Sequence, residues 1–313
     1  MSLAFVFPGQ GSQAVGMLDA FADDAAVQAV LRAADAALGE PLSATIAQGP
    51  AEQLNLTVNT QPAMLVAAYA CHAAWLAAGG PQAAVVAGHS LGEYTALAVA
   101  GALDFSDAVP LVLLRAQAMQ EAVPVGVGGM AAVLGLDDDK VAQACAQAQD
   151  GHPGEVVEPV NFNAPAQVVI AGHKAAVERA CAAAKALGAK RALPLPVSAP
   201  FHSSLLRPAG ERLGQALKGI TLRSPSIPLV NNVDVAVESD PARIADALVR
   251  QAYGPVRWVE VVGKLAELGV DRVIEFGPGK VLAGLVGRID RSIKVHAVYD
   301  PATLQAVLAE VQA

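Results

Sequence analysis

A serine flanked by glycines follows a short run of small apolar residues. Residues 88–92 read Gly-His-Ser-Leu-Gly, between a strand-like stretch at 84–87 and a helix-like stretch. In this setting the G-x-S-x-G pattern indicates a nucleophile, because glycines permit the sharp turn that exposes the Ser90 hydroxyl at the strand's carboxyl end. The N–H groups that open the next helix favour a developing negative charge. A serine that only caps the helix is the alternative, and the pentapeptide alone leaves both open.

A serine nucleophile needs a base, and the chain has six histidines. His202 is the best candidate, because it lies on a loop that returns the chain from one predicted domain to another; a histidine that merely begins a helix is the alternative. His89 is a poor candidate, because neighbours on a tight turn point apart. Packing or surface positions account for the other four: His72, His152, His173 and His296. No Asp or Glu follows the α/β-hydrolase chain order, which leaves a backbone carbonyl to orient the base.

The loop after the first predicted strand carries a second glycine pattern. Residues 9–14, Gly-Gln-Gly-Ser-Gln-Ala, fit the loose dinucleotide fingerprint G-x-G-x-x-A. A dinucleotide-binding unit needs a second strand that ends in an acidic residue about twenty positions further on, and the sequence there is helix-like. We therefore interpret the segment as a strand-end loop whose N–H groups, above all that of Gln10, point towards Ser90.

Arg115 is the remaining residue that could do chemistry. It lies one position past Leu114, on the apolar side of a predicted helix. One interpretation is an arginine that extends from the edge of that face into water. The other is a bidentate clamp for a carboxylate.

The elements that must position these residues alternate between short apolar strands and longer helical patterns. This alternation predicts an α/β fold with a mainly parallel sheet whose strands are buried on both faces. The strands predicted for the larger part of the chain are 3–7, 84–87, 227–231, 272–276 and 294–298.

The middle of the chain has a different order of elements. A glycine-rich link at 123–129 precedes a strand at 130–134, a helix at 137–149, strands at 156–161 and 167–171 joined by the turn-like FNAPA, a helix at 173–187 and a strand at 191–196. The order βαββαβ is typical of a ferredoxin-like unit. We therefore predict a small subdomain at 124–197, inserted into a larger domain formed by 1–123 and 198–313.

Composition excludes several classes of protein. The net charge of −8, with scattered Lys and Arg, argues against nucleic acid as a partner. No run of about 18 apolar residues indicates a membrane span, and no signal peptide is recognisable, so we expect a cytoplasmic protein. The three cysteines, Cys71, Cys145 and Cys181, have no metal-ligand spacing, so we interpret them as packed thiols and expect no metal.

Several motifs occur together in one order. They are FPGQGSQ, GHSLGE, an internal arginine, FHS, VNNVDV, LVRQAYGPVRW and EFGPGKVLAGL. With them the chain resembles the malonyl-CoA:acyl-carrier-protein transacylases along nearly its whole length. The resemblance implies a large α/β-hydrolase-like domain with a ferredoxin-like insert.

The resemblance also implies an S-malonyltransferase of fatty acid synthesis. Such an enzyme moves a malonyl group from malonyl-CoA to the phosphopantetheine thiol of acyl carrier protein, by a ping-pong reaction through a malonyl-serine ester. It uses no cofactor, since coenzyme A enters as part of the substrate. We expect a monomer with a basic patch for the acidic carrier, and Lys190 and Arg191 are candidates for contacts with the coenzyme A phosphates.

Roles for individual residues follow from the same resemblance. Ser90 is implied to be the acylated nucleophile and His202 its general base. Gln10 and Leu91 would supply the N–H groups of the oxyanion hole, and the backbone carbonyl of Gln251 would orient the histidine.

Three further positions match residues that lie near the substrate in this family. Arg115 matches the arginine that binds the malonyl carboxylate, and Asn161 matches a polar position beside the site. Phe201 resembles the residue of malonyl-selective members. Pro200 departs from the pattern, because many relatives have a small residue there.

Other functions stay open at this point. A serine hydrolase would lose its acyl group to water, and a silent binding module would hold acyl-CoA or a carrier without reacting. The malonyl-transfer subunit of a malonate decarboxylase, or a polyketide enzyme, would use the same residues on a different carrier.

Overall fold

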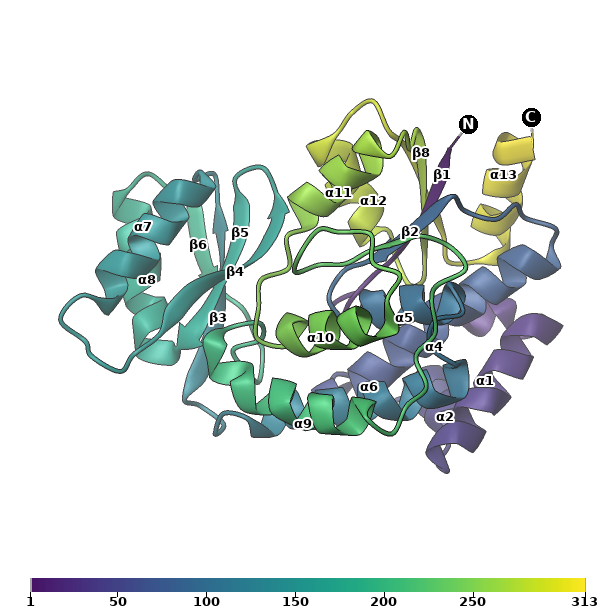
Figure 1. The fold of residues 1–313 in the computed structure, drawn as a ribbon, viewed down its shortest axis with the longest axis horizontal. Helices are drawn as coiled ribbons and strands as arrows, with labels where there is room; N and C mark the ends of the chain where they lie inside the picture. The colour runs from purple at the N-terminus through teal and green to yellow at the C-terminus, as the bar shows by residue number, and fades with distance from the viewer. Residues whose placement is uncertain (1, 313) are drawn as a thin grey trace.

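A parallel sheet lies at the centre of the larger part of the molecule (Figure 1). The computed structural model describes residues 2–312. Within them, the strands of this sheet follow the order β7-β2-β1-β8-β9, and every pairing is parallel. The strands are β1 (Leu3–Phe7), β2 (Val85–Gly88), β7 (Leu229–Val230), β8 (Arg272–Phe276) and β9 (Lys294–Val298).

Strand β1 shows how the sheet is buried on both faces. Its sequence, LAFVF, is apolar throughout, and side chains alternate between the faces. Phe5 and Phe7 pack into the core that includes α4 (Thr57–Ala77), whereas Ala4 and Val6 pack with residues of α11 (Trp258–Glu267) and α12 (Val281–Ile289). Because β1 has no polar positions, both of its faces can pack against helices.

Helix α4 is the long buried helix of the larger part. It has apolar residues on every face, as expected for a helix surrounded by other elements. The helices around the sheet are α1 (Ala25–Leu38), α2 (Leu42–Gln48), α3 (Ala51–Leu54), α5 (Gly92–Val99), α6 (Phe105–Glu121), α9 (Arg207–Leu217), α10 (Pro241–Gln251) and α13 (Pro301–Gln312), with 3-10 turns η1 (Asp19–Phe21) and η2 (Ser204–Leu206). None of the helices in residues 2–312 has the length and apolar character needed to cross a membrane.

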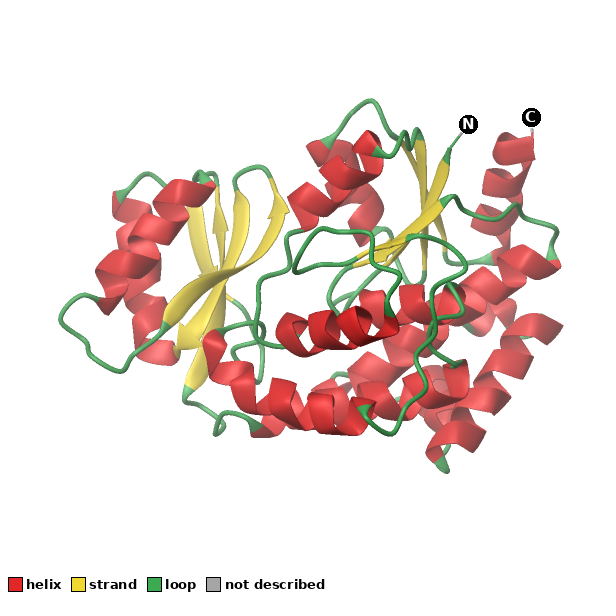
Figure 2. Cartoon of the chain, in the orientation of Figure 1, coloured by secondary structure: helices red, strands yellow, loops and turns green. Residues whose placement is uncertain are grey.

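A separate antiparallel sheet forms the smaller part of the molecule (Figure 2). Its strand order is β4-β5-β3-β6, with β3 (Gly128–Leu134), β4 (Val157–Ala164), β5 (Gln167–His173) and β6 (Arg191–Pro194). Helices α7 (Asp138–Gln149) and α8 (Lys174–Ala186) cover one face. The other face packs against residues of the larger part, among them Met119 and Phe201.

The predicted fold class is confirmed at the level of a mixed α/β protein with a mainly parallel sheet and a separate antiparallel one. Several predicted strands differ from the structure by one or two residues at their ends, and two segments differ more. Residues 227–231 pair only at Leu229 and Val230, because Pro228 has no N–H and the N–H of Asn231 turns to Ala236. The predicted turn FNAPA belongs largely to β4, because Phe162 and Ala164 continue the pairing with β5, opposite Val168 and Gln167. Asn161 of β4 also pairs with Val256 of the larger part.

Replacing Gly92 by alanine should destabilise the fold. A Cβ at this position would lie 1.9 Å from the carbonyl oxygen of Phe7, so α5 would have to move away from β1. We expect Gly92→Ala to lower the free energy of unfolding by about 1–3 kcal/mol, measured by urea denaturation. Gly284→Ala in α12 is the control, because its Cβ would meet no atom within 4 Å. An unchanged midpoint for Gly92→Ala would contradict this packing.

Candidate active site

Ser90 lies on a strained turn between β2 and α5. Its φ is +53°, in the left-handed region that residues with a side chain seldom occupy. The flanking glycines make this turn possible. A Cβ on Gly88 would lie 1.9 Å from the carbonyl carbon of Gly92, and a Cβ on Gly9 would lie 2.9 Å from the carbonyl oxygen of His89. Close packing therefore requires the glycines of G-x-S-x-G here, whereas a serine that only caps a helix would not need them.

Two buried amide side chains hold the strained turn in place. Asn232, which follows β7, accepts the N–H of Ser90 at 2.7 Å and donates to the carbonyl of Gly88 at 2.7 Å. Gln251, the last residue of α10, donates from Nε2 to the carbonyl of Ser90 at 2.9 Å. Asn232 thereby gives the N–H of Ser90 an acceptor, and Gln251 adds a second donor to the Ser90 carbonyl, which also accepts the N–H of Glu93 at 3.1 Å.

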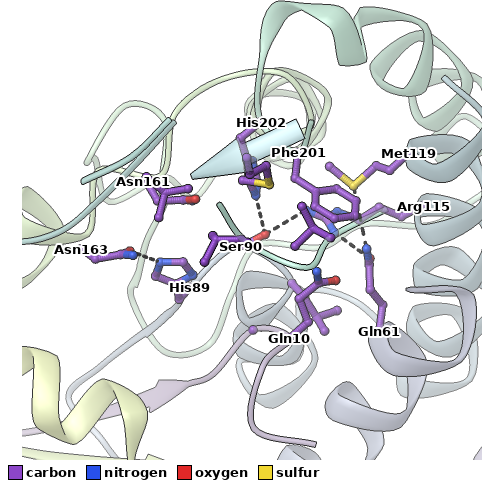
Figure 3. Close-up of a pocket in the computed structure, with 16 residues that line it drawn as sticks. Gln10, Gln61, His89, Ser90, Arg115, Met119, Asn161, Asn163, Phe201 and His202 are labelled. Carbon is purple, nitrogen blue, oxygen red and sulfur yellow. Dashed lines mark hydrogen bonds between the residues drawn. The ribbon is translucent and has the colours of Figure 1, made fainter. Parts of the chain in front are cut away.

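The Ser90 hydroxyl and the His202 imidazole form a hydrogen-bonded pair (Figure 3). Ser90 Oγ lies 2.7 Å from Nε2, and Nδ1 lies 2.9 Å from the backbone carbonyl of Gln251. A carbonyl can only accept, so Nδ1 carries the proton and Nε2 is left to accept from Ser90. Burial, followed by the charge of Arg115, lowers the pKa of His202 to about 3. The imidazole is thus neutral and ready to act as a base.

Arg115 reaches the same serine from α6, although its side chain is only 2% exposed. Its Nη1 donates to Oε1 of Gln61 at 2.6 Å, and its Nη2 donates to Oε1 of Gln251 at 3.0 Å and to Ser90 Oγ at 3.2 Å. The guanidinium carbon lies 5.3 Å from the centre of the Tyr94 ring. Among the described residues no carboxylate contacts it, and its Nε has no partner. A buried cation held only by neutral groups is suited to bind an anion.

A cavity of about 200 Å³ opens onto these groups. Its walls include Gln10, Ser90, Leu91, Arg115, Asn161, Phe201 and His202. Within residues 2–312, the backbone N–H groups of Gln10 and Leu91 have no protein acceptor, so both are free to donate into the cavity. The structure thus brings seven of the eight predicted residues to one cavity. The eighth, Gln251, is fully buried behind His202 and Arg115.

Sequence reasoning missed four polar residues of the site. Gln61 contacts the arginine, Asn232 holds the turn, and Glu93 accepts the backbone N–H of Asn232. Asn163 Oδ1 accepts a 2.8 Å hydrogen bond from Nε2 of His89. A signal existed for two of them. Glu93 is the last residue of the quoted motif GHSLGE, and Asn232 belongs to the quoted motif VNNVDV.

Three other sequence expectations have a structural outcome. Lys190 and Arg191 do not line the cavity, and Arg191 pairs with Leu134 at the opposite end of β3 from the cavity residue Met130. Pro200 packs on Gly128, where a Cβ would lie 2.4 Å from the proline ring, so a glycine accommodates the departure from the family pattern. The three cysteines are buried free thiols, as predicted.

Comparison with known proteins agrees with this geometry. The family model described as "Acyl transferase domain" matches residues 4–299. The chain belongs to this family. Among its acyl transferase relatives, the malonyl CoA-acyl carrier protein transacylase of Salmonella typhimurium is 54% identical, over 98% of this chain and 99% of that protein.

Solved acyl transferases have the same fold. An acyl-carrier-protein S-malonyltransferase from Burkholderia pseudomallei superimposes with a TM-score of 0.96 at 65% identity, covering 99% of this chain and 100% of that one. A malonyl-transacylase solved in complex with a type II PKS acyl-carrier protein gives a TM-score of 0.96 at 48% identity, with 99% and 100% coverage. In the described part of this acyl transferase, no cluster of His, Cys, Asp or Glu could hold a metal ion.

The pH dependence of Ser90 reactivity tests the state of the base. Because the pKa of His202 is lowered to about 3, the imidazole stays neutral at pH 5. We expect labelling of Ser90 by a fluorophosphonate probe to change less than about threefold between pH 7 and pH 5. With an ordinary histidine, the labelling rate would fall about 25-fold over this range. A decline with a midpoint near 6.5, in protein that circular dichroism shows to be folded, would contradict the lowered pKa.

Proposed function

We propose that this protein is a malonyl-CoA:acyl-carrier-protein transacylase of fatty acid synthesis, with Ser90 as the residue that carries the malonyl group. One observation carries the proposal above the others. A buried arginine that no carboxylate of the described residues contacts directly lies 3.2 Å from the hydroxyl of a serine that is paired with a neutral histidine. An acyl group on that serine would have its far end beside the guanidinium, which suits an acyl group that ends in a carboxylate.

The first half of the reaction loads the serine. His202 Nε2 takes the proton of Ser90 Oγ as the oxygen attacks the thioester carbonyl of malonyl-CoA. The N–H groups of Gln10 and Leu91 stabilise the oxyanion of the tetrahedral intermediate. The carbon–sulfur bond then breaks, and His202 returns its proton to the leaving thiolate of coenzyme A. The helix C-terminus that supplies the Gln251 carbonyl favours the imidazolium formed in between.

The second half transfers the malonyl group to the carrier. The phosphopantetheine thiol of an acyl carrier protein gives its proton to His202 and attacks the malonyl ester. The carbon–oxygen bond to Ser90 breaks, and the serine oxygen recovers the proton. No cofactor takes part in either half, because coenzyme A is a substrate that leaves after the first.

Selectivity for malonyl comes from the residues around the far end of the acyl group. Arg115 would hold the carboxylate with two N–H groups through both halves, which also fixes the thioester carbonyl against Ser90. Phe201, at 6% exposure, and Asn161, at 7%, also line the cavity. Phe201 would close it over the malonyl methylene, and Asn161 would offer an amide to the malonyl carbonyl oxygen.

We also infer how the two sheets correspond to domains. Residues 1–123 and 198–313 would form a large α/β-hydrolase-like domain, supported by the serine turn between β2 and α5 of a parallel sheet. Residues 124–197 would form a ferredoxin-like subdomain, supported by the element order βαββαβ and the strand order β4-β5-β3-β6. The monomeric state and the cytoplasmic location stay predictions from the sequence.

Transfer to a carrier tests the activity directly. With malonyl-CoA and a holo acyl carrier protein, we expect malonyl-carrier to form faster than free malonate, measured by mass spectrometry of both products. Ser90→Ala should abolish the malonyl-enzyme. Dominant hydrolysis in the presence of carrier would identify a hydrolase instead, and failure of Ser90 to label would indicate a binding module. Fatty acid and polyketide carriers assayed side by side would show which is preferred.

Replacing Arg115 tests the carboxylate clamp. We expect Arg115→Ala to lose about a hundredfold or more in malonylation of Ser90, because two charge-assisted hydrogen bonds disappear. Acetylation from acetyl-CoA should rise, because a methyl group would no longer face an unpaired buried charge. Arg115→Lys should recover little, since an ammonium cannot present the planar fork. A retained preference for malonyl in Arg115→Ala would rule out the clamp.

A further inference from the structure

Glu93 is a buried acid to which the reaction above gives no part. It lies in the first turn of α5, three residues after the nucleophile, and is only 2% exposed. Its Oε2 accepts the backbone N–H of Asn232 at 2.9 Å and the Nε2–H of Gln251 at 2.9 Å. A carboxylate is costly to bury, so its position beside the site calls for a partner of opposite charge.

The opposite charge is Arg115, which Glu93 reaches through one amide group. The Gln251 amide donates to Glu93 from Nε2 and accepts from Arg115 Nη2 at Oε1. The carboxylate and the guanidinium therefore lie at the two ends of a single side-chain amide, without direct contact. A direct ion pair would occupy the guanidinium N–H groups, whereas this arrangement balances the buried charge and leaves Arg115 available to a ligand.

We propose that the Glu93 carboxylate balances the charge of Arg115 in the free protein. When malonyl binds, its carboxylate takes over this role from Glu93. The inference rests on the proposed function and concerns the specificity of the same site. Before substrate arrives, one cation faces one anion. After malonyl binds, two anions would share Arg115, so binding is strongest when Glu93 takes up a proton from solvent.

The surroundings of Glu93 make this proton uptake possible near neutral pH. Burial raises the pKa of Glu93 to about 7, although the bonds from Gln251 and Asn232 and the charge of Arg115 oppose the shift. The charged and titratable groups that face it are Arg115 on α6, Tyr94 on α5, Asp234 after β7, and His202 behind Gln251.

None of these neighbours titrates between pH 6 and pH 8.5. The pKa of Tyr94 is raised to about 12 and that of His202 is lowered to about 3, both mainly by burial. The bond from Arg250 holds the pKa of Asp234 below its usual range. A pH dependence in this window that affects malonyl and not acetyl therefore reports on Glu93.

The experiment compares KM with kcat for Ser90 acylation across this window. In the wild-type protein, Glu93 gains its negative charge as the pH rises through about 7, and the charge repels the malonyl carboxylate. We expect the KM for malonyl-CoA to rise about tenfold from pH 6 to pH 8.5. The KM for acetyl-CoA is the internal control for titration of the coenzyme A phosphates, and it should not show this rise.

Glu93→Gln should remove the pH dependence and tighten malonyl binding. A glutamine oxygen can still accept from Asn232 and Gln251, so the variant deletes the charge and keeps the bonds. Its KM for malonyl-CoA should be flat and equal to the low-pH value of the wild type. If Glu93 had only a structural role, Glu93→Gln would instead weaken malonyl binding or lower the stability of the protein. Tighter binding of malonyl-CoA therefore distinguishes a counter-charge from a structural residue.

Glu275→Gln is the matched control variant. Glu275 is a second fully buried carboxylate that accepts a backbone N–H, from Ala283 at 2.7 Å, and it does not line the cavity. Its KM profile should follow that of the wild type. A Glu93→Gln profile that also follows the wild type would overturn the proposal for Glu93 alone, whereas a wild-type protein that forms no malonyl-enzyme would overturn the proposed function as well.

Proton uptake by the wild-type protein provides a test that needs no variant. Exchange of a thioester for a serine ester and a protonated thiol releases no net proton. We expect loading with malonyl-CoA at pH 7, in weak buffer with an indicator dye, to take up a fraction of a proton per Ser90, and loading with acetyl-CoA to take up none. Equal signals from the two substrates would overturn the proposal.

Discussion

The hydrogen bonds of Gln251 hold the site together. Its backbone carbonyl is available because Gln251 ends α10, and the last carbonyls of a helix have no partner within it. The His202 ring donates a hydrogen bond to that carbonyl. The side-chain amide of Gln251 contacts Ser90, Glu93 and Arg115 at the same time. One residue, Gln251, therefore positions the nucleophile, the base and the arginine. A displacement of the end of α10 would disturb all three together.

The parallel sheet explains why residues from distant parts of the chain meet there. In the order β7-β2-β1, the loops that follow three adjacent strands leave from the same edge. These loops carry Asn232, Ser90 and Gln10 respectively. The antiparallel sheet supplies the opposite wall, through Met130 and Asn161. The cavity is thus formed by strand ends on one side and by a sheet face on the other.

The sequence located the strands of the large sheet, apart from the ends of β7, and it singled out Ser90, His202 and Arg115 as candidates while leaving an alternative open for each. Each has a local signature: an apolar run, a glycine-bounded serine, a loop histidine, or a charge on an apolar face. The assignments of Gln10, Leu91 and Gln251 needed the family resemblance, because a backbone group has no signature in residue types. Gln61, Asn232 and Glu93 were missed because their partners lie far away in sequence. The extent of β4 was wrong for a different reason: FNAPA has the composition of a turn, whereas its Phe162 and Ala164 pair with β5 near the end of a hairpin.

The link between β4 and Val256 has a consequence for the acyl groups that the site can accept. Val256 donates to the carbonyl of Val160 and accepts from the N–H of Phe162, each at 2.9 Å, so two backbone hydrogen bonds tie the small sheet to the larger part. The wall that bears Asn161 cannot move away from the larger part unless these two bonds break. A branched acyl group would therefore find room only through rotamer changes of flexible side chains in the cavity wall, such as Met119 and Met130.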